Sequence, residues 1–119
     1  MPCLQIELKR VYEPPDSADG VRILVERLWP RGLTKAAAAI DHWTKEVAPT
    51  PALRKWYGHR PELWPEFRQR YLAELAENAA EVDALKRLCA DGPVTFVYAA
   101  KDMERNSATV LRAFLLEET

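Results

Sequence analysis

The chain has 119 residues, a net charge of −1 at pH 7 and an apolar content of 48%. These values indicate one globular domain with its own core and exclude wholesale disorder. The balanced charge disfavours a sequence-independent nucleic-acid binder, which needs a basic excess to neutralise phosphates. No apolar run approaches the roughly 18 residues that span a bilayer, and charges at Glu7, Lys9 and Arg10 interrupt any secretion signal. We therefore expect a cytoplasmic protein that does not contact a membrane.

The first two predicted elements are strands. Residues 4–9 alternate apolar and polar side chains, which is the period of a strand with one buried face, and residues 10–12 can extend it. A turn-forming loop rich in Pro, Asp and Gly follows at residues 14–20. Residues 21–28 then predict a second strand, and its continuous apolar run at 23–25 is typical of a central strand covered on both faces.

The middle of the chain combines short elements with prolines. Pro30 and Gly32 end the second strand, and Thr34 is a suitable N-cap for a short Ala-rich helix that begins with the next residue. Residues 40–47 fit either a helical face or one side of a strand. The prolines that follow favour a short third strand at about 42–47.

Helices and one further strand complete the prediction, and each has its own signal in the sequence. Thr and Asn are good N-caps, Pro is favoured at the first helical position, and β-branched and aromatic residues favour strands. The elements are a helix from Thr50 to about Tyr57 with Pro51 at its first position, an amphipathic helix from Trp64 or Pro65 to about Asp91 (one helix, or two broken near Asn78), a strand at 94–98 and a helix at 107–116.

Strands separated by helices predict an α/β fold, here a compact three-layer α/β/α domain with a small, mostly parallel sheet. In open α/β sheets, ligands bind outside the carboxyl ends of the strands, near a switch in strand order. The two strongest predicted strands are followed by residues 27–32 and 98–102. If these strands are parallel, both segments lie at one edge of the sheet, and we expect the functional site there.

The first of these segments reads Arg-Leu-Trp-Pro-Arg-Gly. Arg27 and Arg31 flank a tight Trp-Pro turn, and arginine presents a planar fork of donors that matches phosphate and carboxylate groups. With Trp29 as a wall, the turn predicts an anion-binding site. In the alternative interpretation Trp29 packs as a lid on the core and the arginines pair with nearby acids, which are Glu26, Asp41 and Glu46.

The second segment contributes three polar candidates. Lys101 can bind an anion or, if desolvated, act as an amine base, and Asp102 can orient it or accept a proton. Asn106 precedes a helix whose N-terminus favours negative charge. The alternative is a solvated Lys-Asp turn with Asn106 or Ser107 as an ordinary N-cap. The predicted ligand site comprises Arg27, Trp29, Arg31, Lys101, Asp102 and Asn106.

Signals for catalysis and cofactors are weak. His59 is a further catalytic candidate beside Lys101 and Asp102, although a histidine in an aromatic-rich loop is more often a packing or surface residue. The chain has no GxSxG, P-loop, GxGxxG or HExxH motif. Cys3 and Cys89 form no CxxC pair, so we expect reduced thiols. Two cysteines and two scattered histidines predict no metal site, and no cofactor is predicted.

The chain resembles the YeaO-like family of bacterial and archaeal proteins, also called domain of unknown function 488. The resemblance covers nearly the whole chain and is most specific in Arg-Leu-Trp-Pro-Arg-Gly-Leu at 27–33 and Tyr-Ala-Ala-Lys-Asp at 98–102. It implies a compact α/β/α domain and no established activity, substrate or cofactor. Two positions depart from the family pattern: Ser107 stands where a His commonly follows the Asn, and Arg60 where an acid commonly follows His59. If that His is a catalytic base in relatives, this chain lacks it.

Three functions are compatible with these features. The first is binding of a small anion, such as a phosphorylated metabolite or nucleotide, at the carboxyl edge of the sheet. The second is a non-enzymatic regulatory domain that binds nucleic acid or a protein through an exposed patch of Arg54, Lys55, Trp56, Arg60, Arg68 and Arg70. The third is a hydrolase or transferase that uses Lys101 and Asp102 or His59.

Overall fold

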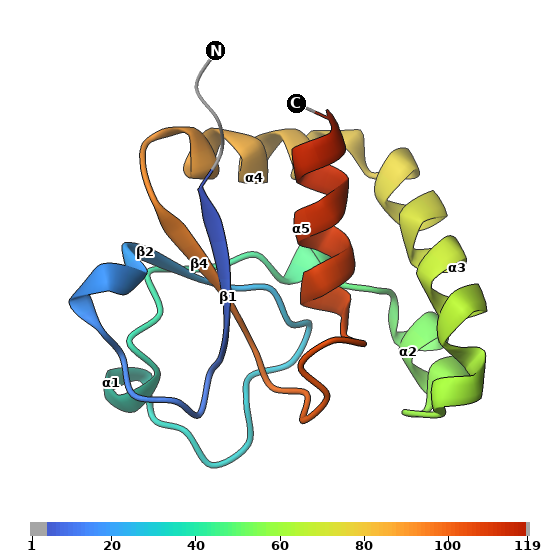
Figure 1. Cartoon of the computed structure of the whole chain (residues 1–119), viewed down its shortest axis with the longest axis horizontal. Coiled ribbons are helices and arrows are strands. Elements are labelled where there is room, and N and C mark those ends of the chain that lie inside the picture. Colours follow the sequence, from blue (N-terminus) through green and yellow to red (C-terminus); the bar gives the residue numbers. More distant parts are fainter. Residues whose placement is uncertain (1–4, 119) are drawn as a thin grey trace.

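A four-stranded parallel sheet forms the centre of the protein (Figure 1). The computed structural model describes residues 5–118, so Leu4, Cys3 and the other predicted features at residues 1–4 lie outside the described residues. The strands are β1 (Ile6–Arg10), β2 (Val21–Leu24), β3 (His42–Trp43) and β4 (Val94–Tyr98). They lie in the order β1-β4-β2-β3, so the last strand of the chain is buried between β1 and β2.

Helices connect the strands, and some of them begin at side-chain caps. The α-helices of the described residues are α1 (Lys35–Ala38), α2 (Pro51–Tyr57), α3 (Trp64–Glu77), α4 (Ala79–Ala90) and α5 (Ser107–Glu118). Thr34 accepts a hydrogen bond from the Ala37 N–H and Thr50 from the Leu53 N–H, which confirms both predicted caps. The long amphipathic pattern forms two helices that break at Asn78.

The two faces of the sheet are covered unequally. Helices α2, α3, α4 and α5 pack on one face and enclose the main core with side chains such as Phe96, Tyr71 and Leu111 (Figure 1). Within residues 5–118 the other face carries α1, the short 3-10 helix Ser17–Asp19 and the loop that follows β2, with a small core of Val11, Leu24, Ala38 and Val97. The predicted α/β class is confirmed, and one outer layer consists of short helical segments.

Two predicted strands are shorter than expected. The strand predicted at 21–28 ends at Leu24, and the one predicted at 42–47 comprises His42 and Trp43. Leu24 pairs with Val97 on one side and with Trp43 on the other. Directly beyond this point the chain after β3 turns into a 3-10 helix (Lys45–Val47), so β2 loses its outer neighbour and ends.

The connections after β2 and β4 leave the sheet on opposite faces. After β2 the chain runs to α1 on the face of the small core, and after β4 it runs to α5 on the face of the main core (Figure 1). Because β2 and β4 are neighbours, a topological switch point lies between their carboxyl ends. This is the place where open α/β sheets bind ligands.

Two further observations concern membrane-spanning helices and the reactivity of a cysteine. None of the helices within residues 5–118 is long and apolar enough to cross a membrane. Cys89 is a free, buried thiol on α4, and burial raises the pKa of this thiol to about 11. A thiol protonated at neutral pH is a poor nucleophile, so Cys89 acts as a core residue.

Candidate functional site

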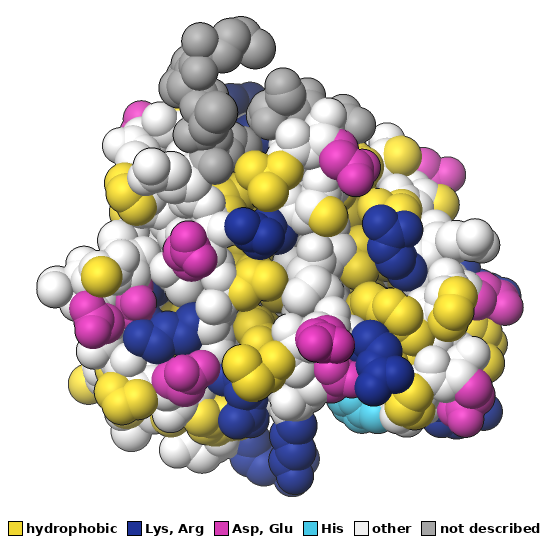
Figure 2. All heavy atoms as spheres, in the orientation of Figure 1, with side chains coloured by type: hydrophobic (Ala, Val, Ile, Leu, Met, Phe, Trp, Pro, Cys, Tyr) yellow, Lys and Arg dark blue, Asp and Glu magenta, His cyan; other side chains and the backbone are white. Residues whose placement is uncertain are grey.

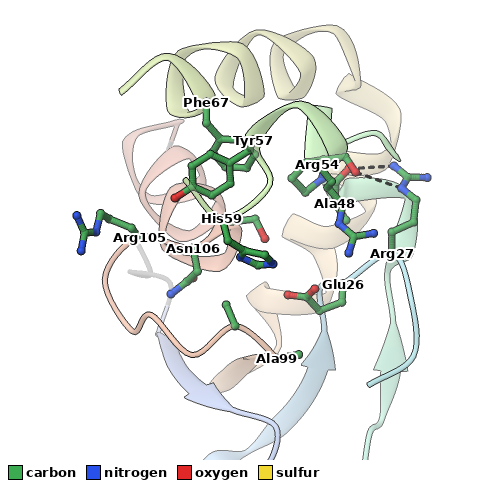
Figure 3. Close-up of a pocket in the computed structure, with 13 residues that line it drawn as sticks. Glu26, Arg27, Ala48, Arg54, Tyr57, His59, Phe67, Ala99, Arg105 and Asn106 are labelled. Atoms are coloured by element: carbon green, nitrogen blue, oxygen red, sulfur yellow. Dashed lines mark hydrogen bonds between the residues drawn. The ribbon is translucent and has the colours of Figure 1, made fainter. Parts of the chain in front are cut away.

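A cavity of about 240 Å³ lies at the switch point. Its walls come from the ends of β2 and β4, from α2 with the loop after it, and from the first turn of α5 (Figure 3). The 13 lining residues are Glu26, Arg27, Ala48, Pro49, Arg54, Tyr57, His59, Phe67, Ala99, Ala100, Arg105, Asn106 and Ser107. The cavity is therefore formed by segments that are up to about eighty residues apart in the sequence, because the carboxyl ends of parallel strands lie at one edge of the sheet.

Arg27 forms one wall and is held in place by backbone carbonyls. Its Nη2 donates to the Ala48 carbonyl at 2.9 Å and its Nε to the Pro49 carbonyl at 3.3 Å (Figure 3, dashed lines). Its Nη1 also lies 3.6 Å from Glu46 Oε2, but that carboxylate is more than half exposed and the pair is screened by water. Arg27 therefore pairs with an acid, as in the alternative interpretation, and it also lines the cavity, while its role in anion binding stays a prediction.

Arg54 projects into the cavity from α2. Figure 3 shows its guanidinium above Glu26. The side chain makes no hydrogen bond or ion pair within residues 5–118, although its charge acts on Glu26. An exposed guanidinium whose donors are unused is the best-placed group in the cavity to bind an anion. The N-cap Thr50 fixes the start of α2, and it also donates to Glu74 Oε2 on α3 at 2.7 Å.

The opposite wall is the N-terminus of α5. Asn106 is buried; its Oδ1 accepts from the Thr109 N–H at 3.0 Å and its Nδ2 donates to the Asp102 carbonyl at 2.9 Å. This confirms the prediction of Asn106 as N-cap, and the residue lines the cavity as well. Because Asn106 and Ser107 both line it, the positive end of the α5 dipole faces the cavity.

Glu26 places a carboxyl group in the same cavity. Burial raises the pKa of this carboxyl, against the opposing effects of a hydrogen bond from the Ala99 backbone and of the charges of Arg54 and His59. The Glu26 carbonyl accepts a hydrogen bond from Trp43 Nε1 at 2.7 Å, which ties the end of β2 to β3. In Figure 3 the carboxyl group points towards the middle of the cavity.

Aromatic rings and a strained histidine close the remaining side. The rings of Tyr57 and Phe67 lie with their centroids 4.5 Å apart, and Tyr57 lies 6.3 Å from the His59 ring. His59 has a φ of 58°, directly after Gly58 at 54°. A left-handed backbone costs a residue other than glycine about 1–3 kcal/mol, and residues strained in this way collect at functional sites.

Trp29 and Arg31 of the predicted site lie outside the cavity. Trp29 donates from Nε1 to the Leu33 carbonyl at 2.8 Å, packs edge-on against Trp43 and belongs to the small core. This is the alternative interpretation, in which the tryptophan covers the core. Arg31 is exposed, and its carbonyl accepts from the Tyr12 hydroxyl at 3.0 Å. Pro30 between them is buried, so the turn is directed to the other face of the sheet.

Lys101 and Asp102 also lie outside the residues that line the cavity. Lys101 is exposed. Asp102 accepts from the backbone N–H groups of Glu104 and Arg105 at 2.9 Å each, and from Arg105 Nε at 2.9 Å. These hydrogen bonds hold the pKa of Asp102 below its usual range. They give its carboxylate a structural role in the turn before α5, and Arg105 stands at the cavity rim with its guanidinium turned outwards (Figure 3).

Two arginines of the predicted basic patch, Arg60 and Arg70, have partners within residues 5–118. Arg70 forms an ion pair with Glu66 and lies 4.4 Å from the centre of the Trp56 ring, and Arg60 donates to the Trp56 carbonyl at 2.9 Å. Figure 2 shows basic and acidic side chains interspersed over the visible face. In the described part of the chain, no group of three His, Cys, Asp or Glu side chains is placed to hold a metal ion.

Sequence reasoning missed Glu26 and Arg105 as cavity residues and assigned Arg54 to a different surface. Glu26 lies two residues after β2, and Arg105 directly precedes the Asn106 cap, so the rule of strand ends and helix starts could have found both. Nothing in the sequence around Arg54 indicates that this side chain lies beside the end of β2. Its place depends on the packing of α2 against the sheet.

Comparison with known proteins gives the family. A family model described as "Inactive DUF488-N3 subclade" matches residues 5–119. The uncharacterized protein YeaO of Escherichia coli is 43% identical over 112 residues, which are 94% of this chain and 97% of YeaO. Uncharacterized proteins of Mycobacterium bovis and Mycobacterium tuberculosis are each 41% identical over 93% of both chains. No solved structure matches the chain. From the fold, the motifs and these matches, the chain belongs to the DUF488-N3 proteins, in the subclade described as inactive.

Proposed function

We propose that this protein binds a small phosphorylated ligand in the cavity between the carboxyl ends of β2 and β4. The observation that carries the proposal is Arg54, whose guanidinium projects into the cavity with its donors unused by residues 5–118. Arg27 adds a fixed positive charge, and Asn106 and Ser107 bring the positive end of α5. An arginine fork and a helix N-terminus are the groups that proteins use for phosphate.

The size of the cavity limits the ligand. Pockets for drug-sized molecules measure roughly 300–1,000 Å³, and this one measures about 240 Å³. A phosphate with a short organic part, such as a sugar phosphate or part of a nucleotide, suits this volume. Such metabolites are cytoplasmic, which agrees with the location expected from the sequence; that location stays a prediction.

Binding without turnover is favoured over catalysis. Asp102 uses its carboxylate in the turn before α5, and Lys101 does not line the cavity, so the two do not form an acid-base pair there. The family resemblance implies a His at the position of Ser107, and the matching subclade is described as inactive. We therefore favour a ligand-binding protein over a hydrolase or transferase. It is also favoured over an interaction domain, because Arg70 and Arg60 of the basic patch are engaged.

Calorimetric titration with inorganic phosphate and with nucleoside monophosphates tests the proposal. We expect Arg54→Ala to weaken binding by about 1.5–3 kcal/mol, or roughly 10- to 150-fold, because hydrogen bonds to a charged group contribute that much. Arg31→Ala is the matched control: it removes the same charge from an exposed site outside the cavity and leaves the affinity unchanged. A lack of saturable binding, or an equal loss in both variants, contradicts the proposal.

A further inference from the structure

Glu26 is at odds with a cavity that binds phosphate alone. Among the 13 described residues that line the cavity it is the one acid. A carboxylate beside a phosphate repels it, and inside a partly closed cavity this repulsion is stronger than in water. A site for bare phosphate has no use for such a group. Its presence points to a second feature of the ligand, one that donates hydrogen bonds.

The hydrogen bonds of Glu26 leave room for such a donor. The Ala99 backbone N–H lowers the pKa of the carboxyl group, and no side chain of residues 5–118 forms an ion pair or hydrogen bond with it. An ionised carboxylate has about four acceptor positions, so most of them face the cavity unused. Because the carboxyl group points towards the middle of the cavity, a ligand can reach these positions (Figure 3).

The neighbours of Glu26 determine which donor fits. The positive charge of Arg54 acts on the carboxyl group from the cavity side. A ligand ammonium group placed there meets the Arg54 cation and is repelled. A hydroxyl group is neutral and donates to the carboxylate without that cost. The site therefore favours hydroxyl groups over amino groups.

We propose that the cavity selects phosphate monoesters of polyols, in which Arg54 binds the phosphate and Glu26 accepts hydrogen bonds from the hydroxyl groups. This inference rests on the proposed phosphate binding and adds the class of ligand. Sugar phosphates and the ribose part of nucleotides share this chemistry. A hydrogen bond to an ionised acceptor is roughly twice as strong as one between neutral groups, so Glu26 contributes to selectivity more than a neutral acceptor would.

A pair of small ligands isolates the hydroxyl groups. Glycerol 3-phosphate and propyl phosphate carry the same phosphate and carbon chain and differ by two hydroxyl groups. We expect the protein to bind glycerol 3-phosphate about tenfold more tightly in calorimetric titration, given the strength of charge-assisted hydrogen bonds. In Glu26→Gln this preference falls towards unity, while inorganic phosphate binds more tightly because the repulsion is gone.

The result separates the two proposals. A purely structural role of Glu26 lowers the affinity for both esters equally and leaves their ratio unchanged, which overturns the inference. Equal binding of both esters by the unaltered protein also overturns it and leaves phosphate binding intact. If no phosphate ester binds, both proposals fail. The Arg54→Ala variant serves as the control, since it weakens both esters and keeps their ratio.

Discussion

The carboxylate of Asp19 lies just before β2 and binds two basic side chains there. Its Oδ2 accepts from Arg22 Nη1 at 2.5 Å and from Lys9 Nζ at 3.2 Å, and Arg22 is 4% exposed. Arg22 also donates from Nη2 to the Ala38 carbonyl at 2.9 Å. The group thereby links β1, β2 and α1, and it holds the thin outer layer to the sheet.

Asp19→Asn should destabilise the protein by about 3–5 kcal/mol, because it leaves the buried Arg22 without its counter-charge. Urea unfolding measures this directly. Glu66→Gln is the control, since it removes an ion pair with Arg70 that is half exposed on both sides, and such helical pairs contribute about 0.3–0.5 kcal/mol. Similar losses in the two variants would show that the Asp19 group is no more than a surface ion pair.

The same residue predicts a pH dependence. Burial raises the pKa of Asp19, but hydrogen bonds from the Asp16 backbone, Lys9 and Arg22 outweigh it, so the net pKa is lowered from 3.8. A lowered folded-state pKa contributes stability that is present above the unfolded pKa and is lost as the pH falls through the folded value. We expect the free energy of unfolding to drop below about pH 4. Asp19→Asn should flatten this drop; an unchanged pH profile would assign it to other carboxylates.

At the scale of elements, Gly20 controls how β2 enters the sheet. It has a φ of 65°, and a Cβ atom there would lie 2.2 Å from the Pro93 carbonyl oxygen, which already accepts from the Val21 N–H at 3.1 Å. β2 and β4 therefore begin side by side only if residue 20 has no side chain. Their carboxyl ends, which form the cavity, depend on this register.

Gly20→Ala should cost about 2–5 kcal/mol, the sum of roughly 1–2 for a left-handed backbone and 1–3 for overpacking. Gly32→Ala is the matched control, because Gly32 has a φ of 81° and open space around the added Cβ. It should cost only the backbone part, about 1–2 kcal/mol. Thermal or urea unfolding compares the two, and equal losses would mean that the Pro93 contact adjusts without cost.

Local signals were sufficient for most elements and for their starts. Thr34, Thr50 and Asn106 cap helices as expected, since capping depends on neighbours within three residues. The ends of β2 and β3 were not predictable in this way. They depend on pairing across the sheet, and the pair of Leu24 with Trp43 is the last one between β2 and β3. The length of a strand depends on its neighbours in the sheet, so it cannot be predicted from the local sequence alone.

At the scale of the whole molecule, the edge of the sheet that carries the cavity was predictable and its detailed lining was not. Parallel strands place residues 26–27 and 99–107 at one edge, so Arg27 and Asn106 were found from the sequence. Arg31 follows Arg27 by four residues but lies on the far side, because Trp29 packs into the small core and turns the loop away. Arg54 reaches the cavity through the packing of α2. Which face a loop or helix covers is decided by tertiary contacts.

The central claim is that a phosphate ligand binds between β2, β4 and α5. Mapping amide chemical shifts of the ¹⁵N-labelled protein during titration with glycerol 3-phosphate tests it most directly. We expect saturable shifts at Ala99, Ala100, Asn106 and Ser107, which line the cavity, and none at residues 34–37 at the start of α1. Shifts centred on residues 31–37, or changes that do not saturate, would contradict the claim.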